Sequence, residues 1–103
     1  MKKYKKAAKV DEISFNDSVK AGVEVKLNVK GYLGDPSWKL LPETIDLNEE
    51  RKIISIKLFA EKKPDAIVIQ VIKKFEKSIP LVFPVAGRWS ILCNQVSLEF
   101  DVE

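Results

Sequence analysis

The last part of the chain holds the pattern that most constrains its fold, because two alternating runs match each other residue by residue. If residues 87–93 (GRWSILC) pair with residues 96–102 (VSLEFDV), one antiparallel register sorts all fourteen side chains by polarity. One face becomes apolar through the pairs Cys93–Val96, Ile91–Leu98, Trp89–Phe100 and Gly87–Val102. The other face is polar apart from one leucine, and it sets Arg88 opposite Asp101. A slip of one residue would turn every side chain to the wrong face, so we predict a β-hairpin.

The turn of this hairpin and its rarest side chains need a separate interpretation. Asn94 tolerates positive φ, but Gln95 is a poor second turn residue where glycine is usual, and a four-residue loop would keep the same register. The register places Trp89 and the single cysteine, Cys93, in the core. A reactive thiol needs a neighbour that lowers its pKa, and the chain has no histidine. We therefore expect Cys93 to be an inert packing residue.

Alternation predicts strands along most of the remaining chain. In residues 22–31 the buried face is expected to carry Val23, Val25, Leu27 and Val29. In residues 53–60 it is expected to carry Ile54, Ile56, Leu58 and Ala60. Further strands are expected at 10–15, at 38–47 with a break at Pro42, and at 78–85. The 21 isoleucine and valine residues, against 9 leucines, also favour strands. We predict an all-β, antiparallel fold of about seven strands, with the turn spacing of a sandwich or barrel.

Residues 66–79 are the ambiguous segment. Apolar side chains recur every fourth residue, as on a helix face, but the run IVIQVI is rich in β-branched residues. We favour a strand and keep a helix as the alternative. Pro80 and Pro84 follow, and because proline cannot donate to a ladder, the strand that contains them should be an edge strand or a bulged one.

Composition excludes most common catalytic and metal sites. With no histidine, one cysteine and one methionine, the chain has no imidazole base, no internal disulfide and no set of soft metal ligands. We expect no enzymatic activity, no catalytic residues, no metal and no cofactor.

The net charge of +3 comes from the first nine residues, which carry five lysines and no acid. The remaining thirteen basic and fifteen acidic residues give −2, so binding of nucleic acid is not expected. We expect residues 1–9 to be a disordered basic tail and residues 10–103 to be one domain.

Several features bear on where the protein resides. The chain shows no secretory signal and no stretch of the roughly 20 apolar residues that a spanning helix needs. A cytoplasmic location is expected if the chain is a whole protein, and an extracellular one if it is a domain cut from a larger surface protein. The heavy use of lysine and glutamate is compatible with a thermophilic source.

The order of these features resembles the immunoglobulin-like or fibronectin-type β-sandwich over residues 10–103. The resemblance rests on the strand in SVKAGVEVKLNV (18–29), on Trp38 at the third-strand position, and on the closing hairpin FPVAGRWSI…VSLEFDV. It implies a core position for Trp38 and a variant of the fold without the disulfide between sheets. It implies a fold and no activity.

We expect a non-catalytic interaction or structural module, either alone or as a domain of a larger or surface protein. Its candidate contact loop is 31–38 (GYLGDPSW), with Tyr32, Asp35 and Trp38 as candidate binding residues. The competing interpretation of this stretch is a turn with one buried aromatic side chain. A carbohydrate- or small-ligand-binding module that stacks its ligand on Tyr32 and Trp38 is the alternative function.

Self-association through a sheet edge, or a protein partner bound there, is also expected. Three apolar residues on outward positions do not fit the two-faced pattern and are candidates for burial in a partner, namely Ile53, Phe59 and Val82.

Overall fold

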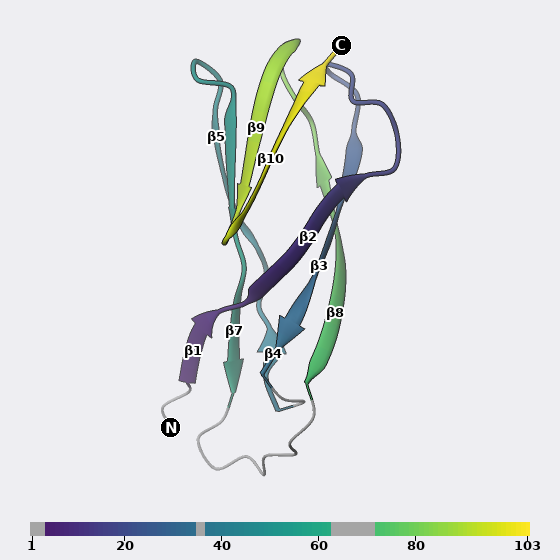
Figure 1. Ribbon diagram of the computed structural model, residues 1–103. Helices are drawn as coiled ribbons and strands as arrows, with labels where there is room; N and C mark the ends of the chain where they lie inside the picture. The colour runs from purple at the N-terminus through teal and green to yellow at the C-terminus, as the bar shows by residue number, and fades with distance from the viewer. Residues whose placement is uncertain (1–3, 35–36, 63–71) are drawn as a thin grey trace.

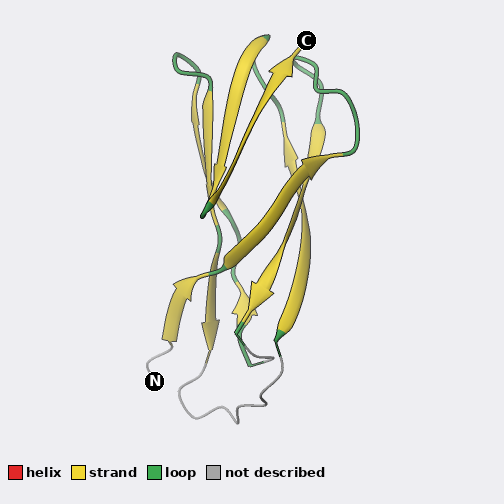
Figure 2. Ribbon diagram, viewed as in Figure 1, coloured by secondary structure: helices red, strands yellow, loops and turns green. Residues whose placement is uncertain are grey.

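The computed structural model describes residues 4–34, 37–62 and 72–103. These residues form ten β-strands and no helix, in an elongated body of about 48 × 25 × 19 Å (Figures 1 and 2). The strands are β1 (Tyr4–Ala7), β2 (Lys9–Phe15), β3 (Val25–Leu33), β4 (Lys39–Leu40), β5 (Thr44–Asn48), β6 (Ile53–Lys57), β7 (Phe59–Lys62), β8 (Lys73–Leu81), β9 (Gly87–Cys93) and β10 (Val96–Val102). The predicted all-β class is therefore confirmed.

The strands of the described residues form three sheets, with the orders β1-β7-β4, β10-β9-β6-β5 and β2-β3-β8. All strand pairs are antiparallel except β6 and β9, which run parallel. Their buried apolar residues form one core cluster. An aromatic group joins β2 to β10, because the ring of Phe15 lies 4.9 Å from that of Phe100, and Phe83 contacts both.

The predicted hairpin is confirmed in its full register, from Cys93 opposite Val96 to Gly87 opposite Val102. Trp89 and Cys93 are completely buried. On the other face Arg88 Nη1 lies 3.2 Å from Asp101 Oδ1, which is the predicted ion pair.

Most predicted inward positions are confirmed, including all four of residues 53–60. Val23 is an exception, with 56% of its surface exposed, because β3 begins only at Val25 and Val23 lies in the preceding turn. Pro80 lies in β8, and β8 is an edge strand of its sheet as expected.

The segment 38–47 is divided near Pro42 into β4 and β5, as expected. In β5, Ile45 pairs with Ile56 and Leu47 pairs with Ile54, so both lie on the core face of the sheet. Nevertheless they are 44% and 40% exposed. The core face of β5 is therefore only partly covered.

At two places along the chain a single residue separates consecutive strands. Both places lie beside the turn between β9 and β10. Ala8 separates β1 from β2, Leu58 separates β6 from β7, and the Ala8 N–H donates to the Leu58 carbonyl at 2.9 Å. Asn94 Nδ2 donates to the carbonyl oxygens of both residues, and the Val10 N–H donates to Oε1 of Gln95. The turn side chains thus connect strands of all three sheets.

The prediction that residues 1–9 form a disordered tail is wrong for the part of this segment that the structure describes. Tyr4–Ala7 form β1, which pairs with β7, and Lys9 begins β2. The pairing with β7 gives these residues backbone partners that their own composition does not reveal. Of the ambiguous segment 66–79, residues 73–79 belong to β8, and residues 66–71 lie outside the described residues.

Candidate functional site

Tyr32 lies near the end of β3, half-buried, and lines two open hollows on the surface. The first hollow has a volume of about 400 Å³ and the second about 340 Å³. Both volumes are in the range of small-ligand sites, roughly 300–1,000 Å³. We call the residues that line the two hollows the Tyr32 face.

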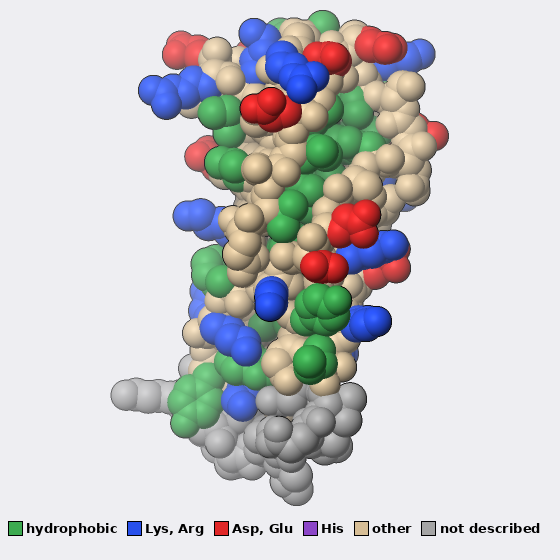
Figure 3. Space-filling model, in the orientation of Figure 1, with side chains coloured by type: hydrophobic (Ala, Val, Ile, Leu, Met, Phe, Trp, Pro, Cys, Tyr) green, Lys and Arg blue, Asp and Glu red, His purple; other side chains and the backbone are tan. Residues whose placement is uncertain are grey.

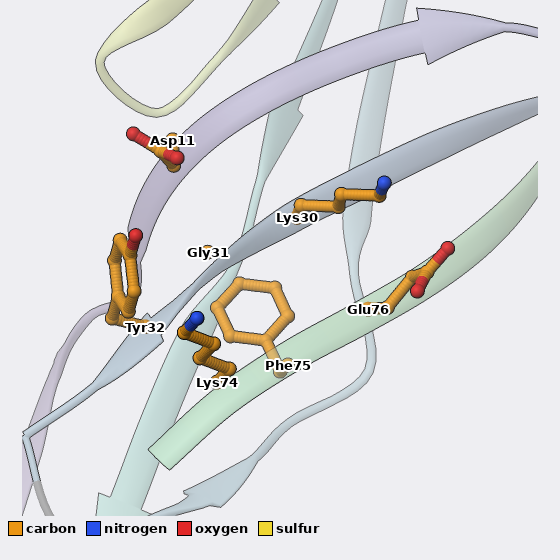
Figure 4. A pocket seen from close by; sticks show the side chains of 7 residues that line it. All are labelled: Asp11, Lys30, Gly31, Tyr32, Lys74, Phe75 and Glu76. Carbon is orange, nitrogen blue, oxygen red and sulfur yellow. The ribbon is translucent and has the colours of Figure 1, made fainter. Parts of the chain in front are cut away.

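The first hollow forms where β2, β3 and β8 come together (Figure 4). Gly31 of β3 pairs with Phe75 of β8, and a Cβ atom at Gly31 would lie 2.7 Å from the Phe75 ring. The same Cβ atom would also collide with the carbonyl oxygen of Lys9. Only glycine therefore allows the ring and the β2 backbone to approach this closely.

A β-bulge shapes the other side of this hollow. The register between β2 and β3 shifts between Val10 and Glu12, which leaves Asp11 as the extra residue. Asp11 lines the hollow together with Tyr32 and Phe75 (Figure 4). Bulges often re-aim a side chain beside a binding site.

Charged side chains surround the two rings of the first hollow. Lys30 and Lys74 line it with Asp11 and Glu76, all of them exposed (Figure 4). None of these four takes part in an ion pair within the described part of the chain. Their charges are therefore available to a ligand.

The second hollow has a more apolar lining and two more lysines. It is lined by Lys6, Ala7, Lys9, Tyr32, Leu33, Gly34 and Ile72. Ile72 is 68% exposed, an unusual position for a large apolar side chain. On the end of the molecule that carries β1, lysine and hydrophobic side chains lie next to one another (Figure 3).

Trp38 is 8% exposed and does not form an open platform. The Nζ atoms of Lys6 and Lys62 lie 4.3 Å and 5.0 Å from the centre of its ring, within the range of cation–π contacts. Lys6 also lines the second hollow, whereas Trp38 does not. Trp38 therefore affects the site through the position of the Lys6 ammonium group.

Of the two predicted binding residues that the structure describes, Tyr32 lines both of these hollows and Trp38 lines neither. Asp35 lies outside the described residues. The predicted loop 31–38 is shorter than expected, because Gly31, Tyr32 and Leu33 belong to β3. Sequence reasoning missed Phe75 and the lysines around Tyr32, and the only signal for Phe75 was the glycine that faces it once β3 and β8 are paired.

Cys93 offers no reactive thiol. Burial raises its pKa from 9.0 to about 11, so the neutral thiol predominates at neutral pH. Within residues 4–34, 37–62 and 72–103, no group of three or more potential metal ligands comes together.

The same described ranges contain no helix that is long and apolar enough to cross a membrane. No protein-family model, curated protein or solved structure matches the chain.

Proposed function

We propose that this chain is a non-catalytic binding module, built as an immunoglobulin-like β-sandwich, whose ligand site is the Tyr32 face. The observation that carries the proposal is the position of Tyr32 between two hollows, with a second ring, Phe75, held against Gly31 in one of them. Aromatic walls with a few polar groups around them are typical of ligand sites.

Two observations support a binding role over catalysis. The chain has no histidine, and its one cysteine has a pKa raised to about 11 by burial. General acid–base catalysis needs a group that titrates near the working pH. The charged groups of the Tyr32 face are suited to hydrogen bonding and charge pairing with a ligand.

A ligand-observed NMR screen tests the proposal. Wild-type protein, Tyr32→Ala and Tyr4→Ala are each mixed with a set of small sugars and polar aromatic molecules, and saturation transfer to each molecule is recorded. Tyr4 is the matched control, because it is an exposed tyrosine of β1 that lines neither hollow. We expect transfer to be lost in Tyr32→Ala and kept in Tyr4→Ala. Equal transfer in all three proteins would rule out the Tyr32 face.

Protein binding through the β5 edge is a second candidate function, and a different observation favours it. Ile45 and Leu47 lie on the core face of β5 and yet are 44% and 40% exposed, so a strand added beside β5 would cover them. Ile53 and Phe59, which were expected at an interface, are half-buried, and Val82 is 51% exposed.

Light scattering at increasing protein concentration tests this second candidate for self-association. If β5 pairs between copies, the mean mass rises with concentration in the wild type and stays that of a monomer in Leu47→Lys. A wild type that stays monomeric at every concentration would exclude self-association through β5.

A further inference from the structure

The Tyr32 face presents three kinds of groups together, and each restricts the ligand. Its aromatic side chains are Tyr32 and Phe75. Its cationic groups are the ammonium groups of Lys6, Lys9, Lys30 and Lys74. Its anionic groups are the carboxylates of Asp11 and Glu76.

We propose that the ligand of the Tyr32 face is an acidic oligosaccharide, a chain of sugars that carry carboxylate groups, which occupies both hollows. This inference rests on the proposed function and names the ligand class of the same site. Tyr32 lines both hollows, so a ligand that fills them passes over its ring. Consecutive sugars then lie on either side of Tyr32, with their apolar C–H faces against aromatic and aliphatic side chains.

The lysines are the reason why we propose an acidic ligand. Each hollow contributes a pair, Lys30 and Lys74 in the first and Lys6 and Lys9 in the second. Lys9, Lys30 and Lys74 form no ion pair with any described carboxylate. A carboxylate on each of two consecutive sugars would therefore meet a pair of donors, in charge-assisted hydrogen bonds.

The two carboxylates of the first hollow favour a sugar over a nucleic acid. Asp11 and Glu76 would repel a carboxylate and a phosphate alike, so the choice between the two ligands rests on the hydrogen-bond donors that each ligand presents. Ionised carboxylates are acceptors only, so they suit a ligand with many hydroxyl donors. A sugar acid supplies both the hydroxyl groups and the negative charge.

Trp38 acts as a positioning residue for this site. Its ring lies 4.3 Å from Nζ of Lys6, which fixes one ammonium group at the second hollow. A Cβ atom at Gly34 would lie 2.9 Å from the same Nζ, so Gly34→Ala should displace Lys6 with little effect on folding.

Isothermal titration calorimetry with three ligands of equal length tests the inference. The ligands are a hexamer of galacturonic acid, the same hexamer as its neutral methyl ester, and a hexamer of thymidine nucleotides. We expect the acid to bind at least about tenfold more tightly than the ester or the nucleotide, a difference of about 1.4 kcal/mol. The advantage over the ester should shrink as salt is added, because salt screens exposed charges.

Variants of the chain locate the binding. Tyr32→Ala should lower the affinity for both sugars, and the double variant Lys30→Gln/Lys74→Gln should lower it for the acid by about tenfold and leave the ester unchanged. Lys26→Gln is the matched control, because Lys26 is an exposed lysine of the same strand that lines neither hollow. Gly34→Ala should weaken only the acid, and a melting curve for each variant checks that it is folded.

Each other outcome overturns the inference in a distinguishable way. Equal affinity for acid and ester, lost in Tyr32→Ala, would contradict the acidic ligand and leave the proposed function in place. A nucleotide hexamer that binds as tightly as the acid would show a general polyanion surface. If neither sugar binds, the inference fails, and the ligand-observed screen with Tyr32→Ala decides the proposed function separately.

Discussion

The side chain of Asn94 and the backbone of Leu58 are hydrogen-bonded to each other in both directions. The Leu58 N–H donates to Asn94 Oδ1, and Asn94 Nδ2 donates to the Leu58 carbonyl, each at 2.9 Å. The same Nδ2 donates to the Ala8 carbonyl at 2.6 Å. The Asn94 carboxamide thus supplies hydrogen bonds to backbone groups of the two residues that separate β6 from β7 and β1 from β2.

We expect Asn94→Gly to lower the free energy of unfolding by about 2–3 kcal/mol, because it removes the acceptor of the buried Leu58 N–H and the Nδ2 donor to the Ala8 carbonyl. Glycine is chosen because Asn94 has φ of 53°, which glycine adopts without strain, so no backbone strain adds to the loss. Urea denaturation measures it. Asn48→Gly is the control, since it removes only an exposed bond to the Arg51 N–H, and it should cost less than about 1 kcal/mol. Equal losses in the two variants would contradict the role of Asn94.

Trp89 is the largest fully buried side chain of the described core, and its Nε1 donates to the Val85 carbonyl at 2.9 Å. We expect Trp89→Ala to cost about 3–5 kcal/mol, close to the whole stability of a domain of this size. The loss is read from the thermal midpoint. A variant that keeps the wild-type midpoint would show that the core assignment is wrong.

Cys93 should make stability fall at alkaline pH. Its pKa is raised from 9.0 to about 11 in the folded protein, so the folded state holds the thiol proton more strongly than the unfolded state does. The contribution of the protonated Cys93 thiol to the free energy of unfolding is complete below pH 9 and is lost as the pH rises through 11. Unfolding measured across this range in the wild type and in Cys93→Ala isolates the effect of the thiol. We expect a smaller decline in the variant, and parallel curves would contradict the prediction.

Gly31→Ala should both destabilise the fold and damage the site. The added Cβ atom meets the Phe75 ring and the Lys9 carbonyl, so we expect a loss of about 1–3 kcal/mol, typical of overpacking. Gly34→Ala is the comparison, because its Cβ atom would press closely only on the flexible end of Lys6. Thermal denaturation of the two variants should therefore differ, and a Gly31→Ala protein as stable as Gly34→Ala would refute the close packing at Gly31.

The sequence predicted elements whose pattern is local. The β9–β10 register followed from alternation alone, because both strands and the turn lie within residues 87–102. The role of Gln95 in the turn could not be predicted from this local pattern, since its Oε1 accepts from the Val10 N–H at the other end of the chain. The strand at Tyr4–Ala7 was missed for the same reason, because its backbone pairs with β7, which lies far along the chain.

Alternation also assigns a side chain to a face without telling whether that face is covered. Ile45 and Leu47 lie on the core face and are still 44% and 40% exposed. At the candidate site, Tyr32 was identified from its own neighbourhood. Phe75 and Lys74 come from β8, more than forty residues further on, and no local pattern connects them to Tyr32.

The most direct test of the account is a map of where ligands contact the protein. Amide chemical shifts of the ¹⁵N-labelled chain are recorded while the molecules found in the ligand-observed screen are added. We expect the shifts to concentrate at Tyr32, Lys74 and Phe75, with Ile45 and Leu47 of β5 unaffected. Shifts that concentrate on β5, or that leave Tyr32 and Phe75 unmoved while ligand binds, would contradict the assignment of the Tyr32 face as the binding site.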